Sequence, residues 1–420
     1  MLEPAHLAIL IVAGLATAGV ILRPMRWPEA IWAVGGAVVL LAFGLVTPAE
    51  ALAAVSRGTE VYFFLIGMMV LAELARREGL FDWTAAYAVR LARGSARRLF
   101  DLVYLVGVAV TALLSNDATA VVLTPAVYAA ARAAKAEPLP YLFICAFVAN
   151  AASFILPISN PANLVLFGDR IPALGAWVVW FGPAAFVAVA MTWVMLRIAF
   201  RGALRVEVSS MVALPRLSAA GRCAGYAIAV ACVVLLVTSA RGGPLGAATF
   251  AVGLVAAAVV LIVGRASPIG LARNVSWSVV PLVAGLFVLV AGLERSGLVA
   301  AVAQEISDAA ASSPRATGFS AGAILAVVCN LMNNLPAGLL AASAAPASVV
   351  PPAVTGALLV GVDLGPNMSV TGSLATILWL IAIRREGEDV GAWRFLKLGV
   401  FVTLPALIPA LGAVVLLAPG

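Results

Sequence analysis

Apolar runs long enough to cross a lipid bilayer recur from one end of this 420-residue chain to the other. The first is HLAILIVAGLATAGVIL at 6–22, and the last is FLKLGVFVTLPALIPALGAVVLLA at 395–418. A helix needs about 20 apolar residues to span a hydrocarbon core of ~30 Å. We find none of the ~10-residue alternating segments of a membrane barrel. The runs therefore predict an all-α polytopic membrane protein, with the first run as its first membrane helix rather than a cleaved signal peptide.

The composition supports this assignment and excludes several functions. Hydrophobic residues make up 64% of the chain and charged residues 11%, whereas soluble domains have about 45–50% and about 25%. The net charge of +7 comes from basic residues scattered over loops, which indicates topology rather than nucleic-acid binding. The four cysteines show no CxxC spacing, so we expect neither disulfides nor a zinc site. No nucleophile–base pair stands out, and we expect neither an enzyme nor a bound cofactor.

The two halves of the chain resemble each other at a constant offset. GMMVLAELARREGL at 67–80 aligns without gaps on GLFVLVAGLERSGL at 285–298, a shift of 218 residues. The same shift brings LLSND at 113–117 onto LMNNL at 331–335. Apolar helices often look alike, but the shared glycines and polar interruptions favour an internal repeat. The predicted units are an N-terminal repeat, a cytoplasmic linker and a C-terminal repeat, over 1–205, 206–222 and 223–420.

Each half is predicted to contain five membrane spans, a re-entrant hairpin and a broken helix. The hairpins are predicted over 99–134 and 316–347, and the two limbs of the first have about 15 residues each, which is short for a span. Their polar tips must be buried in protein or face a wet cavity. The broken helices are predicted over 139–172 and 353–384. An odd number of spans turns the second half upside down, which predicts an inverted repeat of 5+5 spans, as in many secondary transporters.

The Lys and Arg residues predict the orientation in the membrane. With the N-terminus outside, 21 of the 26 fall in cytoplasmic segments, as the positive-inside rule requires. We therefore predict a multi-pass protein of the bacterial inner membrane with both termini on the periplasmic face.

Four polar breaks, two in each half, are predicted to converge near the membrane midplane. Gly and Pro at the breaks interrupt the backbone hydrogen-bond ladder, so that half-helix ends present N–H and C=O groups to a ligand. One break would be a harmless kink, but four symmetrical ones indicate a transport site. The predicted substrate-binding residues are Ser115, Asn116, Thr119, Ser159, Asn160, Asn163, Asn333, Asn334, Gly365, Asn367, Ser369, Thr371 and Ser373.

Two carboxylates, Asp117 and Asp363, lie within these apolar segments. A charge at the centre of a membrane helix costs at least ~2.5–3.5 kcal/mol, which makes such a residue a functional candidate. Burial disfavours the charged form and allows proton exchange, so we predict a proton- or cation-coupling role for both. The alternative is that they cap half-helix N-termini. Glu73 is equally well explained as a partner of Arg76 or Arg77 near the end of its span.

Three segments resemble the arsenical pump membrane protein family of the ion transporter superfamily. They are SNDATAVVLTP at 115–125, NLMNNLPA at 330–337 and GVDLGPNMSVTGSLATILWL at 361–380, and the similarity covers essentially the whole chain, including the RREGLFDWTA turn at 76–85. The resemblance implies a scaffold plus a transport unit with two hairpins. It also implies export of arsenite or antimonite as the neutral trihydroxide, driven by the proton motive force, alone or with a soluble arsenite-activated ATPase subunit. The residues that it places at the site are Asn116, Asp117, Thr119, Asn333, Asn334 and the Asp363–Ser373 loop.

The predicted function is a secondary active transporter that exports arsenite or antimonite, coupled to proton antiport by alternating access. Amide side chains both donate and accept hydrogen bonds, as a neutral trihydroxide does. No Lys or Arg is predicted near the midplane, which favours a neutral or weakly charged substrate. The alternative is a cation-coupled carrier of the same superfamily, either a Na⁺/H⁺ antiporter or an organic-anion symporter, since Asn, Asp and Ser oxygens can bind Na⁺. A purely structural role is disfavoured because four midplane breaks are costly without a ligand.

Overall fold

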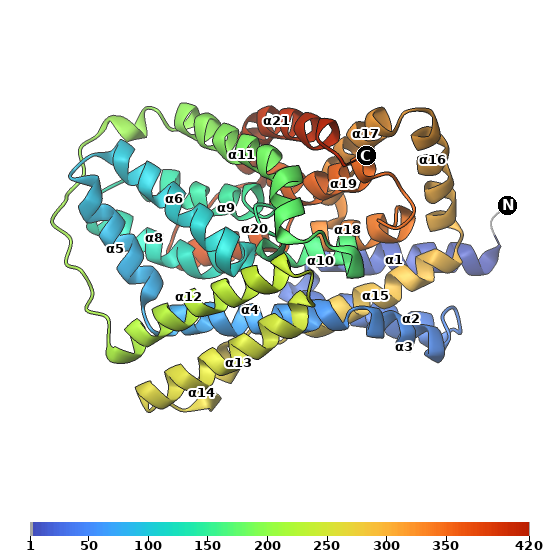
Figure 1. Ribbon diagram of the computed structural model, residues 1–420, viewed down its shortest axis with the longest axis horizontal. Coiled ribbons are helices and arrows are strands. Elements are labelled where there is room, and N and C mark those ends of the chain that lie inside the picture. Colours follow the sequence, from blue (N-terminus) through green and yellow to red (C-terminus); the bar gives the residue numbers. More distant parts are fainter. Residues whose placement is uncertain (1–2, 420) are drawn as a thin grey trace.

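The chain folds into a bundle of helices (Figure 1). The computed structural model describes residues 3–419, and within them the only β feature is an isolated bridge between Ser95 and Glu207. The expected all-α class is confirmed. The helices before the central connection are α1 (Pro4–Leu22), α2 (Glu29–Ala42), α3 (Pro48–Arg57), α4 (Thr59–Arg77), α5 (Leu80–Ala92), α6 (Ala96–Leu114), α7 (Asn116–Ala118), α8 (Thr124–Ala133), α9 (Pro138–Ala151), α10 (Pro161–Phe167) and α11 (Leu174–Ala199). Those after it are α12 (Ala219–Ala240), α13 (Leu245–Gly264), α14 (Pro268–Asn274), α15 (Val279–Arg295), α16 (Leu298–Ser312), α17 (Pro314–Met332), α18 (Asn334–Ala344), α19 (Pro352–Leu364), α20 (Leu374–Arg385) and α21 (Ala392–Leu416).

Among the described residues, six helices are long and apolar enough to cross a membrane: α1, α11, α12, α13, α17 and α21. The number rises to eight if two bent pairs each form one span, α3 with α4 at 49° and α14 with α15 at 42°. Large apolar side chains on their outer faces are exposed, as those of Phe186 and Ile262 are to 75% and 76%. A soluble protein would bury such a surface, so it is expected to face lipid. The ten-span count remains a prediction.

The helix boundaries recur at the offset found in the sequence. Three pairs of helices, α5 and α16, α6 and α17, and α11 and α21, begin 218 residues apart. The first residue of α6 follows the capping hydroxyl of Ser95, and that of α17 follows the capping hydroxyl of Ser313. Ser and Thr are favoured at this position because their oxygen accepts a free N–H of the first turn. The repeat in the sequence is thus accompanied by a repeat in the local structure.

Packing between the halves is reciprocal. Helix α4 packs on α13, and α15, which aligns with α4 at the same offset, packs on α2, which aligns with α13. The two contacts use one of the pairs of glycines that the halves share, Gly67 and Gly285. A Cβ on Gly67 would clash with the backbone of Thr249, and a Cβ on Gly285 would clash with the backbone of Ala33. Small residues let membrane helices approach closely enough for van der Waals packing, which explains why glycine stands at both positions.

Helices α9 and α19 form the centre of the molecule. Both are buried along almost their whole length. A helix that is apolar on every side is typical of a position surrounded by other helices. Each ends at a polar break and is followed by a second short helix, α10 after α9 and α20 after α19. The two broken helices therefore carry their polar breaks into the interior.

Several boundaries differ from the sequence-based expectations. The predicted turn at 76–85 is confined to Glu78 and Gly79, because α5 begins at Leu80. Gly79 takes φ +72, which suits the sharp change of direction there. Helix α3 lies in a stretch to which no element was assigned, and α12 begins at Ala219, inside the predicted linker. The hairpin segments run over 96–133 and 314–344, close to the predicted ranges. Their first limbs are longer than the expected 15 or so residues: α6 and α17 have 19 residues each, and α17 is long and apolar enough to cross a membrane.

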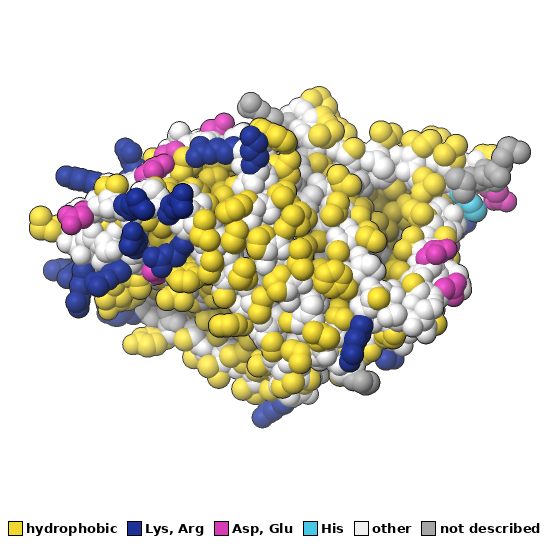
Figure 2. Space-filling view, turned by 90° about the horizontal axis from the view of Figure 1, so that it is seen from above, with side chains coloured by type: hydrophobic (Ala, Val, Ile, Leu, Met, Phe, Trp, Pro, Cys, Tyr) yellow, Lys and Arg dark blue, Asp and Glu magenta, His cyan; other side chains and the backbone are white. Residues whose placement is uncertain are grey.

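Basic side chains gather at one end of the molecule (Figure 2). Figure 1 places α5, α14 and the connection between α11 and α12 at this end, while α1 begins and α21 ends in the opposite half. This distribution is the one that the positive-inside rule associates with a cytoplasmic face.

Candidate functional site

The first hairpin tip is a sharp reversal between α6 and α7. Ser115 adopts φ 127 and ψ 162, a conformation that side-chain-bearing residues rarely take and that costs about 1–3 kcal/mol. On either side of the tip, the hydroxyls of Thr111 and Thr119 lie 2.7 Å apart and hydrogen-bond each other. A single π-helical turn, Thr119–Leu123, then leads into α8. Such π turns are frequent at functional sites.

A cavity of about 400 Å³ reaches this tip. Its polar lining includes Ser115 and the half-buried Asp117 at the tip and Glu73, Arg76 and Arg385 at the ends of α4 and α20. Because Arg76 and Arg385 belong to the basic end of the molecule and are exposed, the cavity opens there. Arg76 makes two hydrogen bonds of 2.6 Å to Glu73, which supports the ion-pair explanation of that glutamate. The sequence led us to expect no Lys or Arg near the midplane, but two arginines line the cavity that reaches this tip.

The second hairpin tip is also a sharp reversal at a residue with positive φ. Asn333 adopts φ 73 and ψ 151 between α17 and α18, and its side-chain oxygen accepts the N–H of Leu335 at 3.3 Å. The N–H of Asn334 donates to the carbonyl of Gly372 at 2.8 Å. Gly372 belongs to the polar break that follows α19, so the tip is attached to the break of the neighbouring broken helix.

Each hairpin is joined to a broken helix by an equivalent hydrogen bond. The hydroxyl of Ser159 donates to the carbonyl of Ala112 at 3.0 Å, and that of Thr371 donates to the carbonyl of Asn330, also at 3.0 Å. Ala112 and Asn330 stand 218 residues apart, three residues before each tip. The two halves thus build the same tip-to-break junction from different hydroxyl residues.

The two breaks also meet each other in the protein interior. Asn160, at the start of α10, donates its amide to Asp363 Oδ1 at 2.7 Å, and both side chains are buried. Asn150, at the end of α9, donates to Asn367 at 2.9 Å and to Thr376 at 3.3 Å. These bonds connect residues more than 200 positions apart, so the polar centre is assembled from both halves.

Three oxygens of this polar centre have no hydrogen-bond partner within residues 3–419. They are Asp363 Oδ2, Asn150 Oδ1 and Asn163 Oδ1. Buried polar groups in folded proteins are nearly always paired, and each exception calls for an explanation. Acceptor oxygens of this kind can bind a proton, a cation or the hydroxyl of a substrate.

The predicted site residues occupy three kinds of position. Ser115 and Asp117 line the cavity, while Asn160, Asp363 and Asn367 bond across the halves. The others lie in the tips and breaks themselves, where they make contacts within one half of the chain. Asn116 Oδ1 accepts the N–H of Asp117, Asn163 donates to carbonyls of its own break, Ser373 caps α20, Ser369 donates to Asn330, and Gly365 packs on the backbone of Ala326.

Sequence reasoning overlooked three residues of this centre, Asn150, Asn330 and Thr376. Asn330 holds the second break by donating to the carbonyl of Gly365 at 3.0 Å and accepting from Ser369 at 2.8 Å. Asn150 and Asn330 stand within apolar helices rather than at Gly/Pro breaks. An amide inside a membrane helix is itself a signal, because it needs a partner there. Among the described residues, no cluster of three or more His, Cys, Asp or Glu is arranged to hold a metal ion.

Comparisons with known proteins agree on the class of protein. The sequence model of the CitMHS family, described as citrate transporter, matches residues 9–367. The arsenical pump membrane protein of Escherichia coli K12 is 29% identical over 396 residues, covering 91% of this chain and 92% of that protein. That of Yersinia enterocolitica is 30% identical over 363 residues, 84% and 85% of the two chains. The solved structure of the Alcanivorax borkumensis YdaH transporter is similar in fold, with a TM-score of 0.59, 16% identity and coverage of 88% and 89%.

Proposed function

This chain belongs to the CitMHS family of transporters, and we propose that it is a secondary active transporter that exports arsenite or antimonite from the cytoplasm in exchange for protons. Its family and relatives are membrane transporters, and it is not an enzyme. The substrate is inferred from the arsenical pump membrane proteins, which are similar over more than four-fifths of the chain.

The observation that carries this proposal is the cavity that ends at Ser115 and Asp117. It leads from the basic end of the molecule, the cytoplasmic side under the positive-inside rule, to a hairpin tip inside the bundle. A substrate taken from the cytoplasm would enter at Arg76 and Arg385 and reach hydroxyl and carboxyl groups at the tip. A neutral trihydroxide can donate hydrogen bonds to these oxygens and accept from them.

We assign proton coupling to Asp117 and Asp363, whose carboxyl groups differ in their access to solvent. Asp117 lines the cavity, so it can exchange protons with the cytoplasmic solution. Asp363 is fully buried and is held by Asn160, with one oxygen that lacks a partner in the described chain. Proton release from Asp117 on one side of the membrane and uptake on the other would couple export to the proton gradient.

Alternating access would follow from movement of the hairpins and broken helices against the surrounding helices. The matching helix boundaries, the reciprocal contacts of α4 with α13 and of α15 with α2, and the matching tip-to-break bonds support an inverted repeat of 5+5 spans. In this arrangement both termini lie on the periplasmic face of the inner membrane. A soluble ATPase subunit, if one is used, would dock on the cytoplasmic face.

Everted membrane vesicles provide the test. Vesicles energised with NADH should accumulate arsenite when they contain this protein, and Asp117→Asn should abolish the accumulation because the amide cannot release a proton. Asp308→Asn is the matched control, since Asp308 is exposed on α16 and lies away from the cavity. Normal accumulation by Asp117→Asn would contradict the coupling role, and no accumulation by the unmodified protein would contradict the substrate.

A cation-coupled organic-anion carrier is the second candidate function. The family description names citrate, and two arginines line the cavity, where they could attract a carboxylate substrate. The discriminating variant is Arg385→Gln. It should leave transport of neutral arsenite nearly unchanged, but it should strongly weaken the transport of citrate if citrate is the substrate. Sodium-dependent citrate uptake that Arg385→Gln reduces would favour this second function.

A further inference from the structure

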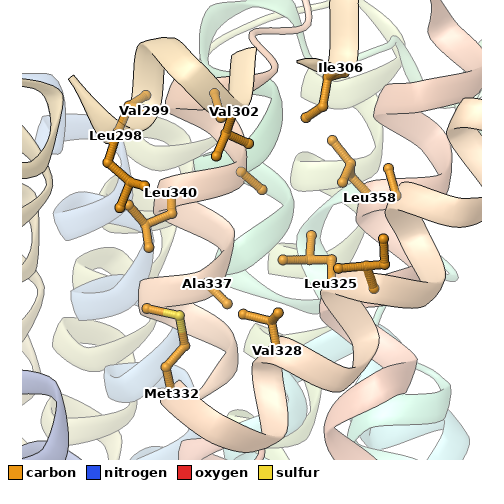
Figure 3. A pocket seen from close by; sticks show the side chains of 14 residues that line it. Leu298, Val299, Val302, Ile306, Leu325, Val328, Met332, Ala337, Leu340 and Leu358 are labelled. Atoms are coloured by element: carbon orange, nitrogen blue, oxygen red, sulfur yellow. The ribbon is translucent and has the colours of Figure 1, made fainter. Parts of the chain in front are cut away.

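A second cavity, of about 370 Å³, lies between α16 and the second hairpin, which is formed by α17 and α18 (Figure 3). Figure 3 shows side chains of α16, among them Leu298 and Val302, facing side chains of α17 and α18 across an open space. All fourteen lining residues are apolar, and none belongs to the candidate site described above. The cavity is therefore separate from the candidate site.

The lining excludes water. An ordered water requires two to four polar partners, and a cavity lined by Leu, Ile and Phe stays dry and takes up apolar molecules instead. The occupant must therefore be apolar.

The mouth of the cavity opens toward the lipid. Three lining residues at its rim, Leu298, Val302 and Ile324, are 44%, 42% and 63% exposed. Ile324 belongs to α17, which is long and apolar enough to cross the membrane. Its exposed side chain therefore faces hydrocarbon. At the inner end, Ala337 of α18 and Leu358 of α19 are 0% and 3% exposed. The cavity thus leads from the hydrocarbon phase into the packed interior.

We propose that this cavity binds one acyl chain of a membrane phospholipid, inserted between α16 and the hairpin formed by α17 and α18. A saturated chain is narrow, flexible and apolar, and the bilayer supplies it at the rim in large excess. The chain contacts both limbs of the second hairpin, so it packs against an element that the transport mechanism moves. The proposal depends on the membrane location of α17 and is independent of the transported substrate.

Photolabelling in proteoliposomes tests the proposal. The vesicles contain phosphatidylethanolamine and phosphatidylglycerol, with a fraction of phosphatidylethanolamine that carries a diazirine at the end of one acyl chain. After illumination, mass spectrometry should find label on Ala337 and Leu358 as well as on Leu331, which is 72% exposed on α17. Label confined to exposed positions such as Leu331 would overturn the proposal.

Two neighbouring valines provide a matched pair of variants. Val328 lines the cavity, whereas Val327 does not line it and is 54% exposed on the same helix. Val328→Phe should place a bulkier side chain in the path of the acyl chain and remove the label from Ala337 and Leu358, while Val327→Phe should keep it. Label on Leu331 serves as the internal standard in both. Val302→Trp, which narrows the mouth by a change at an exposed residue, should also remove the inner label and does not require repacking inside. Retention of the inner label in both Val328→Phe and Val302→Trp would overturn the proposal.

Discussion

Asn160→Ala should weaken the contact between the two halves of the transporter. Asn160 donates to Asp363 Oδ1 at 2.7 Å, and its own side-chain oxygen accepts the N–H of Ala162 at 3.0 Å, which caps α10. The substitution removes both bonds. A buried acceptor left without its partner costs about 1–3 kcal/mol, and loss of an N-cap costs typically ~1 kcal/mol. The free energy of unfolding should therefore fall by about 2–4 kcal/mol.

A double-mutant cycle separates the two contributions. The cap does not involve Asp363, so Asn160→Ala and Asp363→Ala together should show a coupling energy of about 1–3 kcal/mol, the cost of the cross-half bond alone. The four proteins are purified in mixed micelles and unfolded with increasing SDS, and the unfolding free energies are compared.

Thr355→Val supplies the control pair. Thr355 is buried on the same helix as Asp363, eight residues and about 12 Å away along its axis. Its effect should add to that of Asn160→Ala within ~0.3–0.5 kcal/mol, as expected for independent sites. If the Asn160 and Asp363 effects are additive within the same limit, the two side chains do not interact and the proposed contact between the breaks is refuted.

Three further predictions concern the scaffold and the tips. Gly67→Val should lower the melting temperature of the purified protein because the new side chain would meet the backbone of α13. Gly35→Val should not lower it, since Gly35 has open space around it. Equal melting temperatures of the two variants would contradict the close packing. Ser115→Gly should be more stable toward SDS than Ser115→Ala by about 1 kcal/mol, because glycine adopts the positive φ of this position without strain. If Ser115→Ala is the more stable variant, the strain at the tip is contradicted. Asp389→Asn should change neither arsenite accumulation nor the melting temperature. The ion pair of Asp389 with Arg384 lowers the pKa of Asp389, but it is exposed and lies in a connection outside the spans. A clear loss of accumulation or of thermal stability would show a role for that connection.

The apolar runs and the repeat were readable from the sequence because each has a local cause. A membrane helix must be apolar over its whole length, and a polar tip or a Gly/Pro break interrupts that pattern visibly. Asp117 and Asn333 were therefore found at the hairpin tips, and the shared glycines 67 and 285 were found as a pair. The sequence did not reveal that these glycines serve two different contacts between the halves, with Thr249 and Ala33.

Local pattern failed where a residue's environment depends on distant segments. The turn predicted at 76–85 overlaps the start of α5, whose buried face packs on α6 and α8 and makes it a helix. Asn150 and Asn330 gave only a weak signal, since an amide in a helix acquires meaning from the partner that it meets.

The sequence by itself determined that the chain is a membrane protein with two similar halves and four polar interruptions, since these properties reside in the order of residues. Only the tertiary structure decided that Asp117 faces a cavity while Asp363 is buried against Asn160, although the two carboxylates stand in similarly apolar surroundings along the chain. The physical reason is that solvent access depends on which helices pack around a residue. That packing is set by contacts between segments more than 200 residues apart.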